Sequence, residues 1–333
     1  MFSVWVHHNN NACDSHTTRT GVFYSASARK KLWIGRSVSP VLDFDRARFG
    51  QLRRENADRI SISGIQDKIS LCLDKNRLVP TTEDGEFILK PIPGLEGIDQ
   101  LENFPANEHV TMQVAAQVFR LPTAVNGLVF FQDGAPAYIV RRFDRHSQTG
   151  EKLHQEDFCQ LSGRSSDTGG PNYKYDSSYE EIGELLYRFC PAARVEVLKL
   201  FRLVAFDYLI GNGDAHLKNF SLLEGPDGDM LLSPAYDLLN TNVHFPNESR
   251  TALEFFRDFE TPQFCANGFY SSSDFRELGS RFKLPTKQIE GMLVEFGRSF
   301  PAIEELVKRS LLSEKAQHKY LAVVVDRLKA LEI

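Results

Sequence analysis

Hydrophobic and polar residues alternate along the first part of the chain. Isoleucine and leucine occupy every second position in much of the segment 59–80. This spacing is typical of a half-buried strand, because alternate side chains point to opposite faces. Asp84 and Gly85 predict a tight hairpin turn, after which residues 86–91 (EFILKP) form a second strand. Further strands are expected at 128–131 and 137–143.

Helical spacing occurs early in the chain and dominates its later part. Valines at every fourth position predict a helix over 106–120, and a shorter helix is expected at 26–33. The polar residues 1–20 are expected to form a mobile terminus. Later helices are expected at 179–191, 193–211 and 302–332. A strand-rich part followed by a helix-rich part indicates an α+β fold with two unequal lobes.

The composition is that of an ordinary globular protein. Of 333 residues, 42% are hydrophobic and 25% are charged, which excludes a disordered chain and a disulfide-stapled miniprotein. The 39 Lys and Arg residues are outnumbered by 44 Asp and Glu residues. The chain as a whole therefore lacks the basic charge of a dedicated nucleic-acid-binding protein, although a local basic patch is not excluded.

Five widely spaced cysteines without a C-x-x-C pair indicate free thiols in a reducing compartment. No apolar run is long enough to span a membrane, so a cytoplasmic protein is expected.

Lys90 ends one of the predicted strands, and Glu108 lies in the first turn of the helix that follows, 18 residues later. Taken alone, the lysine is a solvated strand end and the glutamate is an acid favoured by the helix dipole. Taken together, they match the lysine–glutamate ion pair that holds a kinase lysine against the nucleotide phosphates.

The segment 209–220 (LIGNGDAHLKNF) carries the most specific signal. Asp214 and Asn219 are separated by the interval that separates the base and a metal ligand in the kinase catalytic loop, and His216 and Lys218 lie between them. A lysine there could balance the charge of a transferring phosphoryl group. A plain polar loop between helices would explain the glycines but not so many different functional groups.

Asp237, in SPAYDLL (233–239), follows a predicted hairpin after this loop, where kinases keep a second metal-binding aspartate. A helix-capping aspartate is the alternative interpretation. The set departs from the kinase pattern in one respect, because the sequence contains no G-x-G-x-x-G. The candidate phosphate loop is 61–68 (SISGIQDK), in which Ser63, the single Gly64 and Lys68 could contact phosphates.

With these motifs in place, the chain resembles the HipA-like serine/threonine kinases, the toxins of bacterial toxin–antitoxin systems. The matching segments are collinear from about residue 59 to 240: SISGIQDKISL (61–71), FILKP (87–91), NEHVTMQVA (107–115), YIVRRFDR (138–145), HQEDFCQLSG (154–163), LIGNGDAHLKNFSLL (209–223) and SPAYDLL (233–239). The opening and the short stretch before the phosphate loop are similar to the short HipT branch of three-component systems, whose chains have no room for the extra N-terminal subdomain of long HipA proteins.

The resemblance implies a protein-kinase-like fold of two lobes, a small β-rich lobe over 1–143 and a larger, mostly helical lobe over 144–333. It implies ATP and Mg²⁺ as cofactors and assigns a role to each motif. The implied roles are catalysis by Asp214, His216 and Lys218; metal binding by Asn219 and Asp237; phosphate contacts by Lys90 with Glu108 and by Ser63, Gly64 and Lys68; adenine binding by the hinge Val140–Phe143; and ribose binding near Asp144.

The resemblance also implies partners. Family members phosphorylate themselves, which points to Ser61 or Ser63, although turn formation would explain both serines without it. Their targets are aminoacyl-tRNA synthetases. A helix-turn-helix antitoxin is expected to bind the toxin and to supply most DNA contacts, and a small separate protein could supply the missing subdomain. No membrane contact is expected.

Two other functions stay open at this point. A small-molecule kinase would share the catalytic aspartate and the metal ligands. It would have no evident use for the pair of serines, Ser61 and Ser63, in the phosphate loop. A nucleotide-binding subunit of a repressor complex, without turnover, is the second alternative; the intact set of Lys90, Asp214, Asn219 and Asp237 argues against it.

Overall fold

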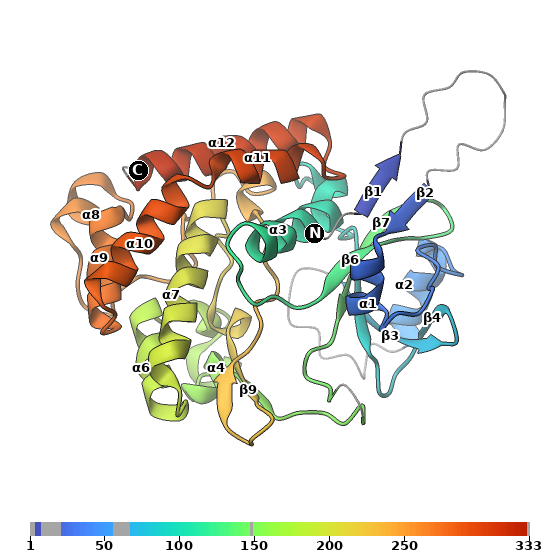
Figure 1. Cartoon of the computed structure of the whole chain (residues 1–333), viewed down its shortest axis with the longest axis horizontal. Helices are drawn as coiled ribbons and strands as arrows, with labels where there is room; N and C mark the ends of the chain where they lie inside the picture. The colour runs from blue at the N-terminus through green and yellow to red at the C-terminus, as the bar shows by residue number, and fades with distance from the viewer. Residues whose placement is uncertain (1–3, 8–20, 56–66, 147–148, 332–333) are drawn as a thin grey trace. The chain divides into compact units, whose positions relative to one another are not determined.

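The computed structural model describes residues 4–7, 21–55, 67–146 and 149–331 (Figure 1). The chain divides into two compact units. The first unit comprises Met1–Gly94, Phe104–His109 and Ala124–Phe143, and the second comprises Leu95–Asn103, Val110–Thr123 and Asp144–Ile333. Residues 95–103 and 110–123 therefore group with the second unit, whereas the lobe proposed over 1–143 includes them.

The first unit is built on a five-stranded antiparallel sheet in the order β4-β3-β5-β7-β6. Its strands are β3 (Ile69–Asp74), β4 (Arg77–Pro80), β5 (Phe87–Pro91), β6 (Asn126–Phe130) and β7 (Pro136–Arg141). The hairpin expected at Asp84 and Gly85 is wrong, because β4 and β5 lie on opposite sides of β3 rather than side by side. The short β4 lies within the segment 59–80 but was not predicted as a strand of its own, because its side chains are mostly not fully buried and show no clear period of two.

Two helices and a hairpin accompany this sheet. Helix α1 (Ala26–Leu32) forms where expected, whereas α2 (Arg46–Glu55) was not predicted because Phe49 is its single buried residue. Strand β1 (Val4–His7) pairs with β2 (Gly21–Tyr24), so the expectation of a mobile terminus is wrong for residues 4–7. The buried ring of Trp33 contacts the rings of Tyr24 and Phe87 and joins helix α1 to the sheet.

The second unit is mostly helical, and α7 is its central helix. Helix α7 packs against α6, α9 and α12, and all its residues from Leu203 to Ile210 are buried. The helices of this unit are α4 (Phe158–Leu161), α5 (Ser166–Gly169), α6 (Tyr179–Phe189), α7 (Ala193–Ile210), α8 (Pro262–Asn267), α9 (Ser272–Arg281), α10 (Thr286–Gly297), α11 (Phe300–Lys308) and α12 (Glu314–Ala330). Helix α3 (Phe104–Gln117) is shared between the two units.

The single helix expected over 302–332 is two helices, α11 and α12. Ser313 starts the second one, because its hydroxyl accepts a hydrogen bond from the backbone N–H of Ala316 and so caps the new helix. A small sheet in the order β10-β9-β8 completes the unit, with β8 (Gln155–Asp157), β9 (Ser221–Glu224) and β10 (Met230–Leu232). None of the helices among the described residues combines the length and apolar character that a bilayer crossing requires.

The close packing of α6 against Phe282 yields a stability test. A Cβ added at Gly183 would lie 2.3 Å from Cε1 of the buried Phe282 ring. We therefore expect Gly183→Ala to lower the free energy of unfolding by about 1–3 kcal/mol, the usual cost of overpacking. Gly291→Ala is the matched control, because no atom lies within 4 Å of its added Cβ, and it should be stabilising by up to about 1 kcal/mol. Urea unfolding measures both, and an unchanged or more stable Gly183→Ala would contradict the expectation.

Candidate functional site

Lys90 and Glu108 meet inside the first unit. Strand β5 carries Lys90 opposite Tyr138 of β7, and the first half of α3 carries Glu108. The lysine Nζ lies 2.7 Å from Oε1 of the glutamate, and their side chains are only 11% and 4% exposed. The ring of Tyr138 lies below the same ammonium group, with its centroid 5.6 Å from Nζ. The two predicted residues thus form a buried ion pair.

The other residues predicted to bind nucleotide are described in part. Lys68 lies directly before β3 and is half-buried, whereas Ser61, Ser63 and Gly64 fall outside the described residues. Val140 is almost buried on β7. The chain leaves the first unit after Phe143 and enters the second at the buried Asp144, so the predicted hinge coincides with a passage between units.

The catalytic loop expected after residue 210 is anchored by α7. Gly211 ends the helix in the left-handed conformation, with φ +71°, and its N–H donates to the carbonyl oxygens of Asp207 and Tyr208. A Cβ at this position would lie 2.5 Å from Cγ1 of Val323 on α12. Both the backbone angle and the close packing require glycine here.

A chain of hydrogen bonds links α7 to Asp214. The side-chain amide of Asn212 donates to Oδ1 of Asp207 at 2.8 Å. The amide oxygen of Asn212 accepts from the backbone N–H of Asp214 at 3.3 Å. Burial raises the pKa of the Asp207 carboxyl to about 7, and the bond from Asn212 opposes this shift. The backbone of Asp214 is therefore tied to the buried helix, while its side chain is 41% exposed.

Two aromatic residues surround the Asp214 carboxylate. The hydroxyl of Tyr175 donates to its Oδ1 at 2.5 Å. Nε2 of His216 lies 3.9 Å from the same oxygen, and the His216 ring meets the Tyr175 ring edge-to-face. Burial lowers the pKa of His216 to about 4 although the Asp214 charge opposes this. His216 is therefore a neutral ring next to the carboxylate at physiological pH.

Lys218 continues the loop, and its ammonium group contacts Tyr173. Its Nζ donates to the Tyr173 hydroxyl at 3.4 Å and lies 5.9 Å from the ring centroid. Its carbonyl oxygen accepts from the hydroxyl of Tyr236 at 2.8 Å. The lysine is thus held near the Asp214 loop by aromatic residues on two segments.

Asn219 and Asp237 each offer an oxygen of a type that binds Mg²⁺. Oδ1 of Asn219 is buried and has no hydrogen-bond partner among the described residues, which is costly unless a further group binds there. Asp237 exposes its carboxylate between the buried Ala235 and Leu238, with a left-handed backbone of φ +56°. Such strain in a non-glycine residue is common at functional sites. Amide and carboxylate oxygens are suitable Mg²⁺ ligands, so these residues fit the ion.

Protein sites for transition metals such as Zn²⁺ are built from clusters of His, Cys, Asp and Glu. No cluster of three or more such residues occurs in the parts of the chain that the structure describes. A self-contained protein cage for a transition metal is not found in those parts.

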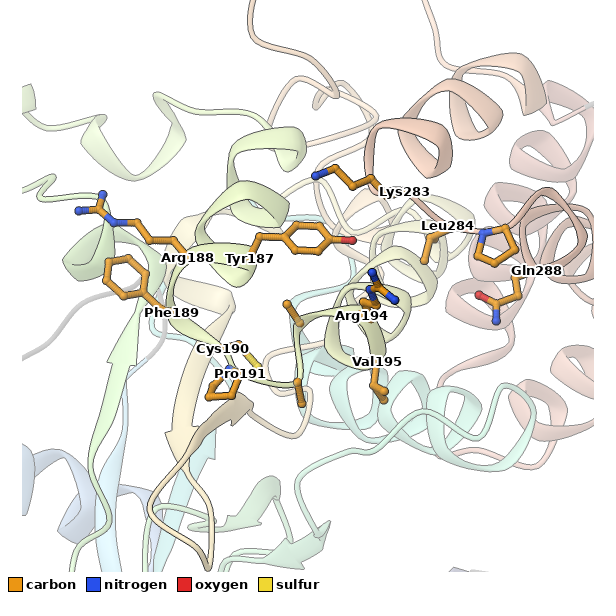
Figure 2. A pocket seen from close by; sticks show the side chains of 13 residues that line it. Tyr187, Arg188, Phe189, Cys190, Pro191, Arg194, Val195, Lys283, Leu284 and Gln288 are labelled. Atoms are coloured by element: carbon orange, nitrogen blue, oxygen red, sulfur yellow. The ribbon is translucent and has the colours of Figure 1, made fainter.

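A second-unit pocket of about 960 Å³ contains none of the predicted site residues. Figure 2 shows it between the end of α6, the start of α7 and the segment 283–288. Its lining includes Arg188, Arg194 and Lys283 and no acidic residue. It is thus a local basic patch, a feature that the net charge of -5 for the whole chain does not exclude.

Several residues around Asp214 were missed by the sequence analysis. Tyr175 lies 39 positions before Asp214, and Glu248 lies 34 positions after it, so no local spacing connects them. Asp207 was hidden in an apolar helix, where a single acid gives no motif. Asn212 lies within the segment 209–220, and its position between Asp207 and Asp214 was the one sequence signal that could have indicated its role.

The fold defines the class of protein. The structure aligns with HipA from Shewanella oneidensis, solved together with HipB and operator DNA, at a TM-score of 0.64 and 22% identity, over 86% of this chain and 71% of that one. The fold is therefore the α+β, kinase-like fold of HipA. The HipA-like C-terminal domain model matches residues 60–303, and the chain belongs to this family.

Curated relatives are named as kinases. A putative kinase from Haemophilus influenzae is 27% identical over 311 residues, which are 87% of each chain. The serine/threonine-protein kinase toxin HipA of Shewanella oneidensis is 27% identical over 266 residues, 75% of this chain and 58% of that protein. The chain thus spans most of one relative and little more than half of the other.

The buried ion pair predicts an asymmetric effect on stability. Glu108→Leu alone should lower the free energy of unfolding by about 3–5 kcal/mol, because the ammonium group of Lys90 then stays buried without this carboxylate. The double variant Lys90→Met/Glu108→Leu should recover most of that loss, because both charges are removed together. Urea unfolding of the two single variants and the double variant forms the necessary cycle. Simple addition of the two single losses would contradict the prediction.

The buried position of His216 predicts its titration. In the native protein the ring should stay neutral between pH 8 and about pH 5, since its pKa lies near 4, while the unfolded chain takes up a proton near pH 6.5. The His216 contribution to stability is thus present above about pH 6.5 and is lost as the pH falls toward 4. NMR of the His216 ring protons, in buffer and in urea, measures the pKa in the native and the unfolded chain. A native pKa near 6.5 would contradict the prediction.

Proposed function

We propose that the protein is an ATP- and Mg²⁺-dependent serine/threonine protein kinase, the toxin of a toxin–antitoxin system. The observation that carries the proposal is the loop after α7. Asp214 exposes part of its side chain, while its backbone is hydrogen-bonded to a residue that is tied to a buried helix. Five positions later, the buried Oδ1 of Asn219 has no hydrogen-bond partner among the described residues. Membership of the HipA-like family supports the same chemistry.

Each group has a separate task in this proposal. Asp214 accepts the proton of the acceptor hydroxyl, and the neutral His216 packs beside it without adding a positive charge. Lys218 places positive charge near the transferred group. Asn219 and Asp237 hold Mg²⁺, which when bound neutralises charge on the β- and γ-phosphates.

The nucleotide is assigned to groups of the first unit and the following hinge. Lys90 contacts the α- and β-phosphates, and Glu108 holds its ammonium group in place at 2.7 Å. Ser63, Gly64 and Lys68 line the phosphates, the backbone of Val140–Phe143 takes adenine, and Asp144 lies near the ribose. Arg141 stands in this hinge, and backbone recognition of adenine tolerates its side chain.

Substrates and partners complete the proposal. We infer autophosphorylation at Ser61 or Ser63 and an aminoacyl-tRNA synthetase as the target. The related Shewanella oneidensis HipA was solved with HipB and operator DNA, which supports a helix-turn-helix antitoxin partner here and an indirect route to DNA. We also infer a partner in a small separate protein that supplies an N-terminal subdomain.

Transfer of labelled phosphate tests the proposal. Wild-type protein with ATP and Mg²⁺ should label itself, with a mass shift at Ser61 or Ser63, and should label a synthetase in a panel of purified enzymes. Asp214→Asn should reduce transfer by about 10²–10⁴-fold, the usual contribution of a general base, while calorimetry shows that ATP still binds.

The control is Asp227→Asn, a change of the same kind at an exposed position in the turn between β9 and β10. It should leave transfer unchanged. Wild-type protein that binds ATP without any transfer would instead support a binding subunit. Transfer to a small molecule alone, with unmodified serines, would support a small-molecule kinase.

A further inference from the structure

A second pocket of the second unit lies directly against the catalytic loop. It has a volume of about 830 Å³, and its walls include Tyr175 and the segment 248–254. Both walls contact the loop. The hydroxyl of Tyr175 donates to Asp214, and a Cβ added at Gly213 would lie 2.6 Å from Cδ of Glu248 and 2.7 Å from the carbonyl oxygen of Ser249. The absence of a side chain at Gly213 lets this wall approach the loop.

Tyr175 binds one oxygen of the Asp214 carboxylate and leaves the other available. The phenol bonds to Oδ1, and Oδ2 accepts no hydrogen bond within the described part of the chain. Burial and the Asp214 charge both raise the pKa of Tyr175 above its usual value, so the hydroxyl keeps its proton and remains a donor. The His216 ring packs edge-to-face on the Tyr175 ring, and Lys174 lies over it, which restricts the rotation of the phenol.

The pocket walls carry both signs of charge. Arg164 is bound by Glu181 through two hydrogen bonds of 2.8 and 2.9 Å. Arg257 lies 3.1 Å from Glu184. The lining residues include four acids and three arginines: Asp176, Glu181, Glu248 and Glu254, with Arg164, Arg250 and Arg257. A pocket that carries both signs of charge, with acids in slight excess, does not select a free phosphate or a nucleic acid, and it suits a polypeptide of mixed polarity.

We propose that Tyr175 is a positioning residue on the acceptor side: its hydroxyl fixes Oδ1 of Asp214 so that Oδ2 faces the acceptor, and its ring is a wall of the pocket that receives the acceptor polypeptide. This inference rests on the proposed kinase function. In the step concerned, the acceptor oxygen bonds to the γ-phosphorus, its proton passes to Oδ2, and the bond between that phosphorus and the bridging oxygen breaks to release ADP. Tyr175 keeps its own proton throughout.

Two substitutions separate the tasks of the hydroxyl and the ring. The acceptor probe is a synthetic peptide spanning residues 56–68 of this chain, which contains both candidate serines. Tyr175→Phe keeps the wall and loses the hydrogen bond, so kcat should fall about tenfold or more, with peptide KM and ATP Kd within about twofold of wild type. Tyr175→Ala should show the same loss of kcat together with a peptide KM raised about fivefold or more.

The matched control is Tyr187→Phe, which removes a phenol donor to the carbonyl oxygen of Phe282, away from this pocket. Its kcat and KM should equal those of wild type. A Tyr175→Phe variant with unchanged or increased kcat would overturn the positioning role, as would a loss of kcat matched by lost ATP binding and a lower melting temperature. An unchanged peptide KM in Tyr175→Ala would overturn the acceptor pocket.

The same experiment distinguishes this inference from the function on which it rests. Wild-type protein that binds ATP but labels neither itself nor the peptide would overturn the kinase function and the Tyr175 role together. Wild-type transfer that Tyr175→Phe leaves intact would overturn the Tyr175 role alone.

Discussion

The burial of the second half of α7 is the constraint on which the proposed catalytic loop depends. Every residue from Leu203 to Ile210 is buried, so this half of the helix cannot rotate or shift without disrupting contacts on all its sides. Gly211 then turns the chain sharply, and Asn212 ties the next residues back to Asp207. The position of Asp214 is therefore set by hydrophobic packing that lies outside the site itself.

The proposed phosphate-binding lysine and the proposed catalytic loop are each held by contacts within one compact unit. Lys90 and Glu108 pair inside the first unit, and the loop with Asp214 and Asn219 is held inside the second. The lysine and the loop are held in place by different kinds of interaction. A buried ion pair fixes the lysine, at a desolvation cost that only its partner offsets, whereas the loop is fixed by a helix end, short hydrogen bonds and aromatic rings.

The sequence predicted those parts of the structure whose signals are local. The α+β pattern, the helices around 106–120, 179–191 and 193–211 and the family were confirmed by the structure and the comparisons. The pairing of Lys90 with Glu108 was also predicted, since a strand lysine and a glutamate of the following helix match the ion pair of kinases.

Other features lacked such a signal. Strand β4 and helix α2 bury too few residues to show a period, and the helices between 262 and 297 lay in a region with only loose resemblance. Tyr175 and Glu248 reach the Asp214 loop across 39 and 34 positions through tertiary packing. No motif relates residues that meet only when the chain has folded, so these neighbours of Asp214 could not be predicted.

The left-handed backbone at Asp237 sets folding against the proposed metal-binding role of this residue. Glycine or asparagine adopts this conformation at lower cost than aspartate, so the residue that suits the turn best is not the one that offers a charged oxygen to a metal. Sequence optimisation for thermal stability alone would favour removing the aspartate. A stabilised version of this protein would have to treat position 237 as fixed, and its retention across a set of engineered variants would separate selection for chemistry from selection for folding.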